Sequence, residues 1–170
     1  MKPLEADSIV ECLNRHGVRY VLIGGLAAVL HGSPQVTFDV DICPARDPED
    51  LERLAPALRE MGARVRATGA PDGLSFSCDS RFLAGVQILN LVTNHGDLDV
   101  SFQPSGTSGY PDLVRSASTI TLKGQSVRVA ALEDIIRSKE AAGRPKDQAA
   151  LPILRQLLEV IRKQEPPAGE

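Results

Sequence analysis

The sequence predicts an α/β domain, in the broader sense α+β, in which a small mixed β-sheet is flanked by helices. Stretches with helical spacing of apolar residues alternate with short β-rich runs, the pattern that places helices against a sheet. The 170 residues are 42% apolar and 24% charged, which is ordinary for one globular domain. No internal repeat or linker is visible, so we expect a single domain over residues 1–163 and a disordered tail over 164–170.

The N-terminal half is expected to contain three helices and three strands. Apolar residues at helical spacing precede Gly17, which can adopt the left-handed conformation that ends a helix. Asp47 followed by Pro48 is a strong helix start, because Asp is a common cap and Pro fits the first turn. Pro56 is expected to kink that helix. The expected helices are 5–16, 25–31 and 47–61, the expected strands are 19–23, 37–42 and 64–68, and 69–80 is expected to be a loop.

The C-terminal half contains two turn signals between apolar runs. The segment 94–97, Asn-His-Gly-Asp, separates one pair of runs, and Lys123-Gly124 separates the other, so we expect two hairpins. The expected strands are 88–93, 98–102, 120–122 and 126–129, and the expected helices are 110–117, 132–142 and 146–163.

The net charge of −3 argues against a generally basic nucleic-acid binder. The charge is nevertheless uneven, because residues 1–122 carry 10 basic and 15 acidic side chains while residues 123–163 carry 9 basic and 5 acidic ones. A positive face near the C-terminus that serves phosphate or RNA would explain this imbalance. A solvated helix surface explains it equally well.

The cysteine pattern and the hydropathy favour an intracellular protein. Three cysteines lie far apart with no CxxC or Cys/His cluster, which excludes a disulfide framework and a zinc-finger site. No apolar run approaches the ~20 residues of a membrane span, and the acidic N-terminus lacks the apolar core of a secretory signal. We therefore expect a cytoplasmic protein with reduced thiols and no membrane partner.

Asp39 and Asp41 stand two residues apart in an apolar, strand-like run. Residues at this spacing share one face of a strand, so the two carboxylates repel unless a cation lies between them. Carboxylate oxygens on a rigid strand suit Mg²⁺ or Mn²⁺. An exposed edge strand with two acids is the simpler alternative. An EF-hand is excluded, because Cys43 and Pro44 occupy the positions of a ligand and of the required glycine.

Gly24-Gly25 follows a predicted strand and opens a predicted helix. At such a turn the backbone can approach a phosphate closely and present free N–H groups to it. A tight turn without a ligand explains two glycines as well. The dinucleotide fingerprint GxGxxG is absent, which disfavours a Rossmann site.

These residues together resemble the signature of the polymerase-β-like nucleotidyltransferases. The chain has Ile23-Gly24-Gly25, then thirteen residues, then the acid–apolar–acid–apolar run 39–42. The resemblance implies a nucleotidyltransferase-like core with C-terminal helices. It also implies that Asp39 and Asp41 hold metal ions, that the Gly-Gly turn holds a nucleotide triphosphate, and that a later strand supplies a third carboxylate.

Two aspartates compete for the third position. Asp99 interrupts the apolar run 98–102 and therefore needs a partner, whereas Asp97 lies in a predicted turn, where Asp is common for its own reasons. We therefore predict that Asp99 is the third ligand.

The segment 129–147, VAALEDIIRSKEAAGRPKD, resembles the C-terminal segment of small toxin-type nucleotidyltransferases, the MenT and AbiEii groups of toxin–antitoxin systems. Lys139 continues the apolar face of Leu132, Ile135 and Ile136, so its ammonium needs a destination. A nucleotide phosphate and a buried carboxylate are both candidates, and the third alternative is a stem that reaches out to solvent. Arg144 and Asp147, later in the segment, either bind substrate or pair with each other and brace the helix junction.

The resemblance implies an enzyme that transfers a nucleoside monophosphate from an NTP to an acceptor hydroxyl. Asp39, Asp41 and Asp99 would hold Mg²⁺ or Mn²⁺ and be catalytic together with Lys139. The predicted nucleotide-binding residues are Gly24, Gly25, Ser33 and Lys139. For Ser33, a residue that only shapes its loop is the alternative.

The toxin-type relatives imply tRNA as the acceptor and a cognate antitoxin as a partner. A partner protein, or an aminoglycoside or lincosamide antibiotic, is an alternative acceptor. A non-catalytic nucleotide-binding or partner-binding module is the alternative to an enzyme. One departure is Gln35, where many relatives have Arg, and it puts the acceptor or nucleotide preference in doubt.

Overall fold

The computed structural model describes residues 2–166, which form seven helices and one eight-stranded sheet. The helices are α1 (Ala6–Arg15), α2 (Gly24–Leu30), α3 (Pro48–Glu60), α4 (Ser80–Ala84), α5 (Tyr110–Ser116), α6 (Leu132–Ala142) and α7 (Pro145–Gln164). The strands are β1 (Tyr20–Ile23), β2 (Asp39–Pro44), β3 (Arg64–Ala67), β4 (Ala70–Leu74), β5 (Ile88–Thr93), β6 (Gly96–Ser101), β7 (Ser118–Leu122) and β8 (Gln125–Val129). The predicted α/β class with a mixed sheet flanked by helices is confirmed.

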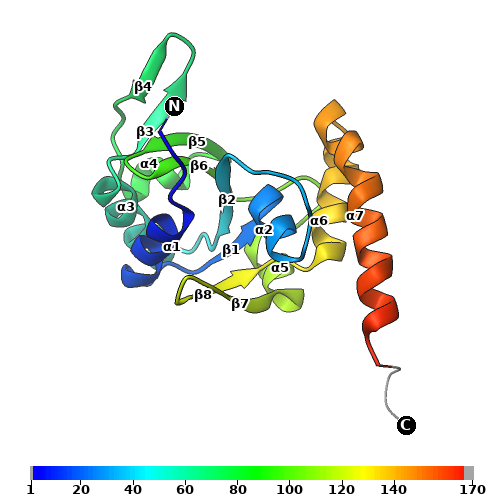
Figure 1. Ribbon diagram of the computed structural model, residues 1–170. Helices are drawn as coiled ribbons and strands as arrows, with labels where there is room; N and C mark the ends of the chain where they lie inside the picture. The colour runs from blue at the N-terminus through cyan, green and yellow to red at the C-terminus, as the bar shows by residue number, and fades with distance from the viewer. Residues whose placement is uncertain (1, 167–170) are drawn as a thin grey trace.

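The sheet has the order β4-β3-β5-β6-β2-β1-β8-β7. The pairs β2–β6 and β1–β8 are parallel, and the other neighbouring pairs are antiparallel. Figure 1 shows the β3–β4 hairpin projecting from one side of the molecule, and α6 and α7 packed against each other on the opposite side. None of the described helices combines the length and the apolarity that crossing a bilayer requires.

The central strands β2 and β6 have two chemically different faces. Val40 and Ile42 of β2 and Leu98 and Val100 of β6 are completely buried in the apolar core. Since side chains alternate along a strand, the intervening residues point to the other face, and in both strands these include aspartates. Packing of the apolar face therefore fixes the direction in which the acidic residues point.

Both predicted hairpins are present. Asn94 and His95 connect β5 to β6, and Lys123 and Gly124 connect β7 to β8. The first turn is shorter than the predicted 94–97, because Gly96 and Asp97 belong to β6. Lys123 and Gly124 both have positive φ, at 45° and 84°, which is the conformation of the two-residue turns that suit twisted hairpins. The bounds of α6 agree with the predicted helix 132–142.

The prediction of a loop over 69–80 is wrong, because β4 occupies 70–74 and pairs with β3. Pro71 and Gly73 make this segment look like a loop in the sequence, because both residues are uncommon in strands. Both are tolerated in β4 because it is the edge strand of the sheet. A short helix, α4, was also not predicted, and Asp79 caps it by accepting a hydrogen bond from the Phe82 amide at 2.7 Å. Asp47 lies at the N-cap of α3 as predicted, yet its carboxylate caps nothing and lies 3.5 Å from Arg19.

The predicted disordered tail lies mostly outside the described residues. Of the range 164–170, Gln164 is the last residue of α7, and residues 167–170 are not described.

Candidate active site

Three carboxylates converge on the polar face of strands β2 and β6. The strands pair in parallel with Asp41 opposite Asp99, so their side chains leave the same face of the sheet side by side. Asp39 lies two residues before Asp41 and joins them. One oxygen from each of Asp39, Asp41 and Asp99 lies within 4.8 Å of the other two. The structure thus brings together the three residues that the sequence predicted as metal ligands.

Asp97, the competing candidate, points to the same face but lies outside this cluster. Its position on β6 is opposite Asp39 of β2. Its Oδ2 atom lies 3.3 Å from the Nη2 atom of Arg66, an arginine of β3. Asp97 therefore forms an ion pair with Arg66 and is not one of the three clustered carboxylates.

The cluster raises the pKa values of two of its carboxyl groups, those of Asp41 and Asp99. Burial raises the pKa of Asp41 to about 7, and the charges of Asp39 and Asp99 add to that shift. Burial also raises the pKa of Asp99 to about 6, although the nearby Arg66 opposes the increase. These carboxylates therefore lack sufficient positive charge around them.

The donor set fits a hard divalent cation. Three carboxylates supply only oxygen, the ligand atom that Mg²⁺ and Mn²⁺ prefer. The Oδ1 atom of Asp99 is buried and accepts no hydrogen bond from the described residues. Arg66 lies 3.0 Å from this oxygen without forming a hydrogen bond to it. A buried carboxylate oxygen that accepts no hydrogen bond is costly, and a bound cation would satisfy it.

A second group of side chains that could bind a metal already has its hydrogen-bond partners. It consists of Cys12, His16 and Glu60. The Cys12 thiol lies 2.8 Å from Glu60, and the His16 ring lies 3.2 Å from the same carboxylate oxygen. Arg15 donates two hydrogen bonds of 2.8 Å to Glu60 and already supplies the positive charge. This cluster is a satisfied hydrogen-bond network that needs no ion.

The two glycines lie directly beside the carboxylates. Ile23, the last residue of β1, is opposite Asp41 in the sheet, and Gly24 begins α2 immediately afterwards. Gly24 has a φ of +70°, and a Cβ atom there would run into the Asp41 carboxylate. A Cβ atom on Gly25 would lie 3.1 Å from the Thr37 hydroxyl. The glycines thus allow the start of α2 to approach the acidic cluster closely.

We expect Gly24→Ala to damage both stability and the site. The methyl group would meet Asp41, and alanine is strained at a positive φ, so we expect a loss of about 1–3 kcal/mol of unfolding free energy. Urea unfolding of the variant measures this loss. Gly69→Ala is the matched control, because Gly69 also has a positive φ of +80° but a Cβ atom there would meet nothing within 4 Å. Equal losses in the two variants would mean that crowding against Asp41 contributes nothing.

Lys139 of α6 reaches a buried carboxylate. Its ammonium lies 3.6 Å from Oδ1 of Asp147, whose side chain is 1% exposed. Arg144 donates from Nε and Nη2 to the same carboxylate at 2.6 and 3.2 Å, so the predicted pairing of Arg144 with Asp147 at the helix junction is present. Lys139 also lies close enough to Asp41 to oppose the rise of its pKa. Its side chain is only 20% exposed, which differs from a stem extended into solvent.

Ser33 has a local partner in the loop between α2 and β2. Its hydroxyl is largely buried and accepts a hydrogen bond from the Gln35 amide at 3.3 Å. This bond corresponds to the loop-shaping alternative for Ser33.

Arg66 is the residue near the cluster that the sequence did not single out. The run 64–67, Arg-Val-Arg-Ala, places Arg64 and Arg66 on one face of β3 by its alternation. That alternation was the available signal, but it does not say which acidic residues the arginines meet.

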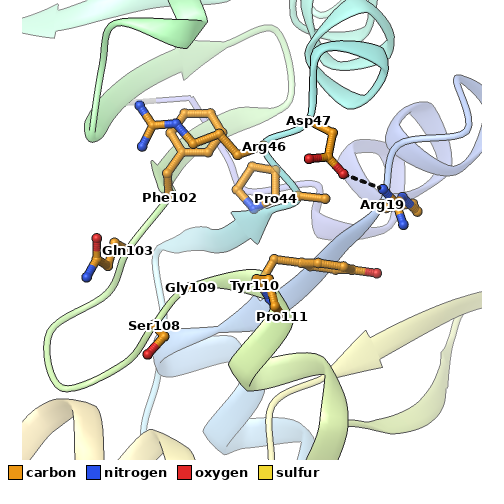
Figure 2. Close-up of a pocket in the computed structure, with 11 residues that line it drawn as sticks. Arg19, Pro44, Arg46, Asp47, Phe102, Gln103, Ser108, Gly109, Tyr110 and Pro111 are labelled. Atoms are coloured by element: carbon orange, nitrogen blue, oxygen red, sulfur yellow. Dashed lines mark hydrogen bonds and ion pairs between the residues drawn. The ribbon is translucent and has the colours of Figure 1, made fainter.

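A cavity of about 440 Å³ lies at the other end of β2 and does not include the carboxylates. Figure 2 shows Arg46 lying over the Phe102 ring, and Asp47 and Arg19 paired across from it. Pro44, at this end, is five residues from Asp39, or about 16 Å along an extended strand. The candidate active site is therefore the carboxylate cluster and not this cavity.

No protein-family model and no curated protein matches this sequence. Solved structures do match the fold. The lincosamide antibiotic adenylyltransferase LnuA, solved with lincomycin bound, matches 92% of this chain and 99% of its own, with a TM-score of 0.61 and 16% identity. The chain has the nucleotidyltransferase fold. ANT(2'')-Ia, solved with adenylyl-2''-tobramycin, matches 92% of each chain with a TM-score of 0.55 and 16% identity.

A Thermotoga maritima protein described as a nucleotidyltransferase shares this fold over 93% of the present chain and 96% of its own. Its TM-score is 0.53 and its identity 18%. The nucleotidyltransferase fold therefore extends over nearly the full length of the chain, including the region of α6 and α7.

Proposed function

We propose that this protein is a metal-dependent nucleotidyltransferase that transfers a nucleoside monophosphate from an NTP to an acceptor hydroxyl and releases pyrophosphate. The observation that carries the proposal is the convergence of Asp39, Asp41 and Asp99 beside the Gly24 turn, within a nucleotidyltransferase fold. Three clustered carboxylates, two of which have raised pKa values, are costly to keep together without a cation to bind.

The residues of the site have distinct proposed roles. Asp39, Asp41 and Asp99 would hold Mg²⁺ or Mn²⁺, which would lower the pKa of the attacking hydroxyl and neutralise charge on the leaving pyrophosphate. Gly24 and Gly25, which carry no side chain, would let a triphosphate approach the backbone N–H groups at the start of α2. Lys139 adds a positive charge that Asp147 holds in position.

Replacing Lys139 with methionine tests this role, because methionine keeps an apolar stem and removes the ammonium. We expect NTP affinity to fall about tenfold, equivalent to ~1.4 kcal/mol, while circular dichroism shows an intact fold. Isothermal titration with NTP and Mg²⁺ measures the change. Lys146→Met, a neighbouring exposed lysine, is the control. Unchanged NTP affinity and turnover in Lys139→Met would leave Lys139 only as a partner of Asp147.

The resemblance to toxin-type nucleotidyltransferases favours tRNA as the acceptor, with an antitoxin as a partner. The basic C-terminal segment offers limited support. Six of its nine cationic side chains already lie within 4.0 Å of an acidic group in the described part of the chain, namely Lys123, Arg137, Lys139, Arg144, Arg155 and Arg162. This internal pairing leaves fewer free cationic side chains in the segment to bind the phosphates of RNA.

A small hydroxylated antibiotic is the second candidate acceptor. The observation that favours it is the near full-length match to LnuA and ANT(2'')-Ia, whose structures contain lincomycin and adenylyl-tobramycin. The match covers 99% of LnuA, so that protein has little additional chain to form an acceptor site that this protein lacks.

The deciding experiment measures pyrophosphate release from each NTP with Mg²⁺, in separate reactions containing tRNA, a lincosamide, an aminoglycoside or a co-purified partner protein. We expect release with one acceptor class, and we expect none with the Asp39→Asn variant. Absence of transfer to every acceptor, together with Mg²⁺-dependent NTP binding, would instead support the non-catalytic nucleotide-binding alternative.

A further inference from the structure

Arg66, a residue of β3, contacts the acidic cluster on β6. Its Nη2 atom lies 3.0 Å from Oδ1 of Asp99 and 3.3 Å from Oδ2 of Asp97, and it donates to the Leu91 carbonyl at 3.1 Å. This one nitrogen therefore lies near three acceptor oxygens but donates a hydrogen bond only to the Leu91 carbonyl. The Nε atom of Arg66 is buried and has no hydrogen-bond partner among the described residues.

The Arg66–Asp99 pair is consequently a poor hydrogen bond although it is a close charge contact. The Oδ1 atom of Asp99 lies 3.0 Å from Nη2, yet the geometry makes no hydrogen bond. Arg19 and Asp50 form the contrasting case, because Nε and Nη2 of Arg19 reach the two oxygens of Asp50 at 2.8 and 2.7 Å. The two-pronged pair is the stronger arrangement of an arginine and a carboxylate. Arg66 is thus held at Asp99 mainly by charge, and a stronger cation can replace it there.

Asp97 offers Arg66 a second position. Asp97 and Asp99 lie two residues apart on β6 and point to the same face, and only Asp99 belongs to the three-carboxylate cluster. The guanidinium can therefore leave Asp99 and still pair with Asp97 after a small movement of its side chain. Arg66 would keep a partner in both positions.

We propose that Arg66 is a positioning residue that competes with the divalent cation for Asp99, and that Asp97 receives its guanidinium when the cation binds. This inference rests on the proposed function, because it assumes that Asp39, Asp41 and Asp99 hold the cation. Arg66 neutralises Asp99 before the cation binds. Once the cation is bound, Arg66 pairs with Asp97 and helps to keep the neighbouring Asp99 carboxylate in its orientation. It does not touch the reacting atoms.

The proposal predicts effects of opposite sign at two neighbouring residues. Arg66→Met removes the competing cation and should tighten the binding of Mn²⁺ alone about tenfold. Asp97→Asn removes the second position, so Arg66 stays on Asp99 and Mn²⁺ binding should weaken about tenfold. In the double variant, Arg66→Met with Asp97→Asn, the guanidinium that Asp97 would bind is absent. Asp97→Asn should then change Mn²⁺ affinity only by a small long-range charge effect.

The experiment titrates each intact variant with Mn²⁺ at pH 8.5, following free Mn²⁺ by electron paramagnetic resonance. Arg64→Met is the matched control, because Arg64 lies on the same face of β3 but donates to Asp72, Gly73 and Ser75 and does not contact the cluster. Its Mn²⁺ affinity should stay within about twofold of the parent. Arg66→Lys keeps the charge and should lie between the parent and Arg66→Met.

The outcomes separate this inference from the proposed function. If the parent binds Mn²⁺ and Arg66→Met binds it equally or more weakly, Arg66 does not compete for Asp99 and the inference alone is overturned. If Asp97→Asn weakens binding equally with and without Arg66, Asp97 acts by its own charge and the inference fails as well. If the parent binds no Mn²⁺ with or without NTP, the proposed function falls and the inference falls with it. Should Arg66→Met not fold, the Arg66→Lys and Asp97→Asn titrations still decide the sign.

Discussion

Replacing Asp41 with asparagine is expected to abolish nucleotide transfer while leaving thermal stability without metal equal or higher. Asparagine keeps the shape of the side chain but removes one of three mutually repelling charges. We expect the free energy of unfolding to rise by about 1–2 kcal/mol at pH 8, or about 2–8 °C in melting temperature. Transfer should fall by about a thousandfold or more, equivalent to ~4 kcal/mol of transition-state stabilisation.

The stability effect of Asp41 should depend on pH with a definite sign. The pKa of Asp41 is about 7 in the folded protein, above the usual ~4 of an unfolded chain, so the folded state binds the proton more tightly. The penalty from Asp41 is therefore largest above pH 7 and disappears as the pH falls toward 4. Without metal, the parent should gain stability relative to Asp41→Asn between pH 8 and pH 5.

Thermal melting of both proteins, with and without Mg²⁺ and NTP, tests these expectations. Added Mg²⁺ and NTP should raise the melting temperature of the parent more than that of the variant, since a ligand stabilises through its affinity for the folded state. Asp47→Asn is the control, because Asp47 is 79% exposed and lies outside the cluster. A variant at Asp41 that loses stability without metal and still transfers nucleotide would identify Asp41 as a structural acid.

Asp147→Asn is expected to be the most destabilising of the proposed changes. Burial alone would raise the pKa of Asp147, but Arg144 and Lys139 hold it below its usual value. Asparagine would leave both cations without their buried partner, and breaking such a pair typically costs several kcal/mol. We expect a loss of about 3 kcal/mol, since Arg144 is partly exposed, which corresponds to about 6–12 °C in melting temperature.

Arg155→Ala provides the matched control on the same helix. Arg155 pairs with Glu140 at 2.9 Å, but both side chains are about half exposed, so its removal should cost less than about 1 kcal/mol. Chemical denaturation at pH 7 measures both losses. The loss from Asp147→Asn should shrink as the pH falls below about 4, because the unfolded chain then binds a proton at Asp147 while the lowered pKa keeps this group ionised in the folded parent. Equal small losses in the two variants would show that Asp147 is well solvated and does not brace the helix junction.

Local patterns in the sequence determined much of the fold around the site. The two-residue spacing of Asp39 and Asp41 within an apolar run places both on the polar face of β2, because the alternate residues Val40 and Ile42 must be buried. The turns at 94–95 and 123–124 and the bounds of α6 likewise follow from local signals. Predictions of this kind succeed because they depend on a strand's alternation or on a turn's backbone angles.

The strand β4 shows where local signals fail. Its residues, Ala-Pro-Asp-Gly-Leu, have low β propensity, and pairing with β3 outweighs that preference. Nothing in residues 70–74 alone specifies that partner.

Only the tertiary structure decided that the three predicted aspartates meet and that Arg66 lies beside them. Asp97 and Asp99 have the same spacing on β6 as Asp39 and Asp41 on β2, so the two members of each pair share a face, but this spacing does not say which aspartates of the two strands lie side by side. The parallel register that places Asp99 beside Asp41 joins strands more than fifty residues apart in the sequence, and it is set by packing of their buried faces. The contact of Arg66 with Asp97 and Asp99 also requires β3 to reach the sheet beside β5. The sequence by itself determined which faces are acidic and basic. Only the strand order and register decided which charges meet, because a charge pair depends on distance in space and not on separation along the chain.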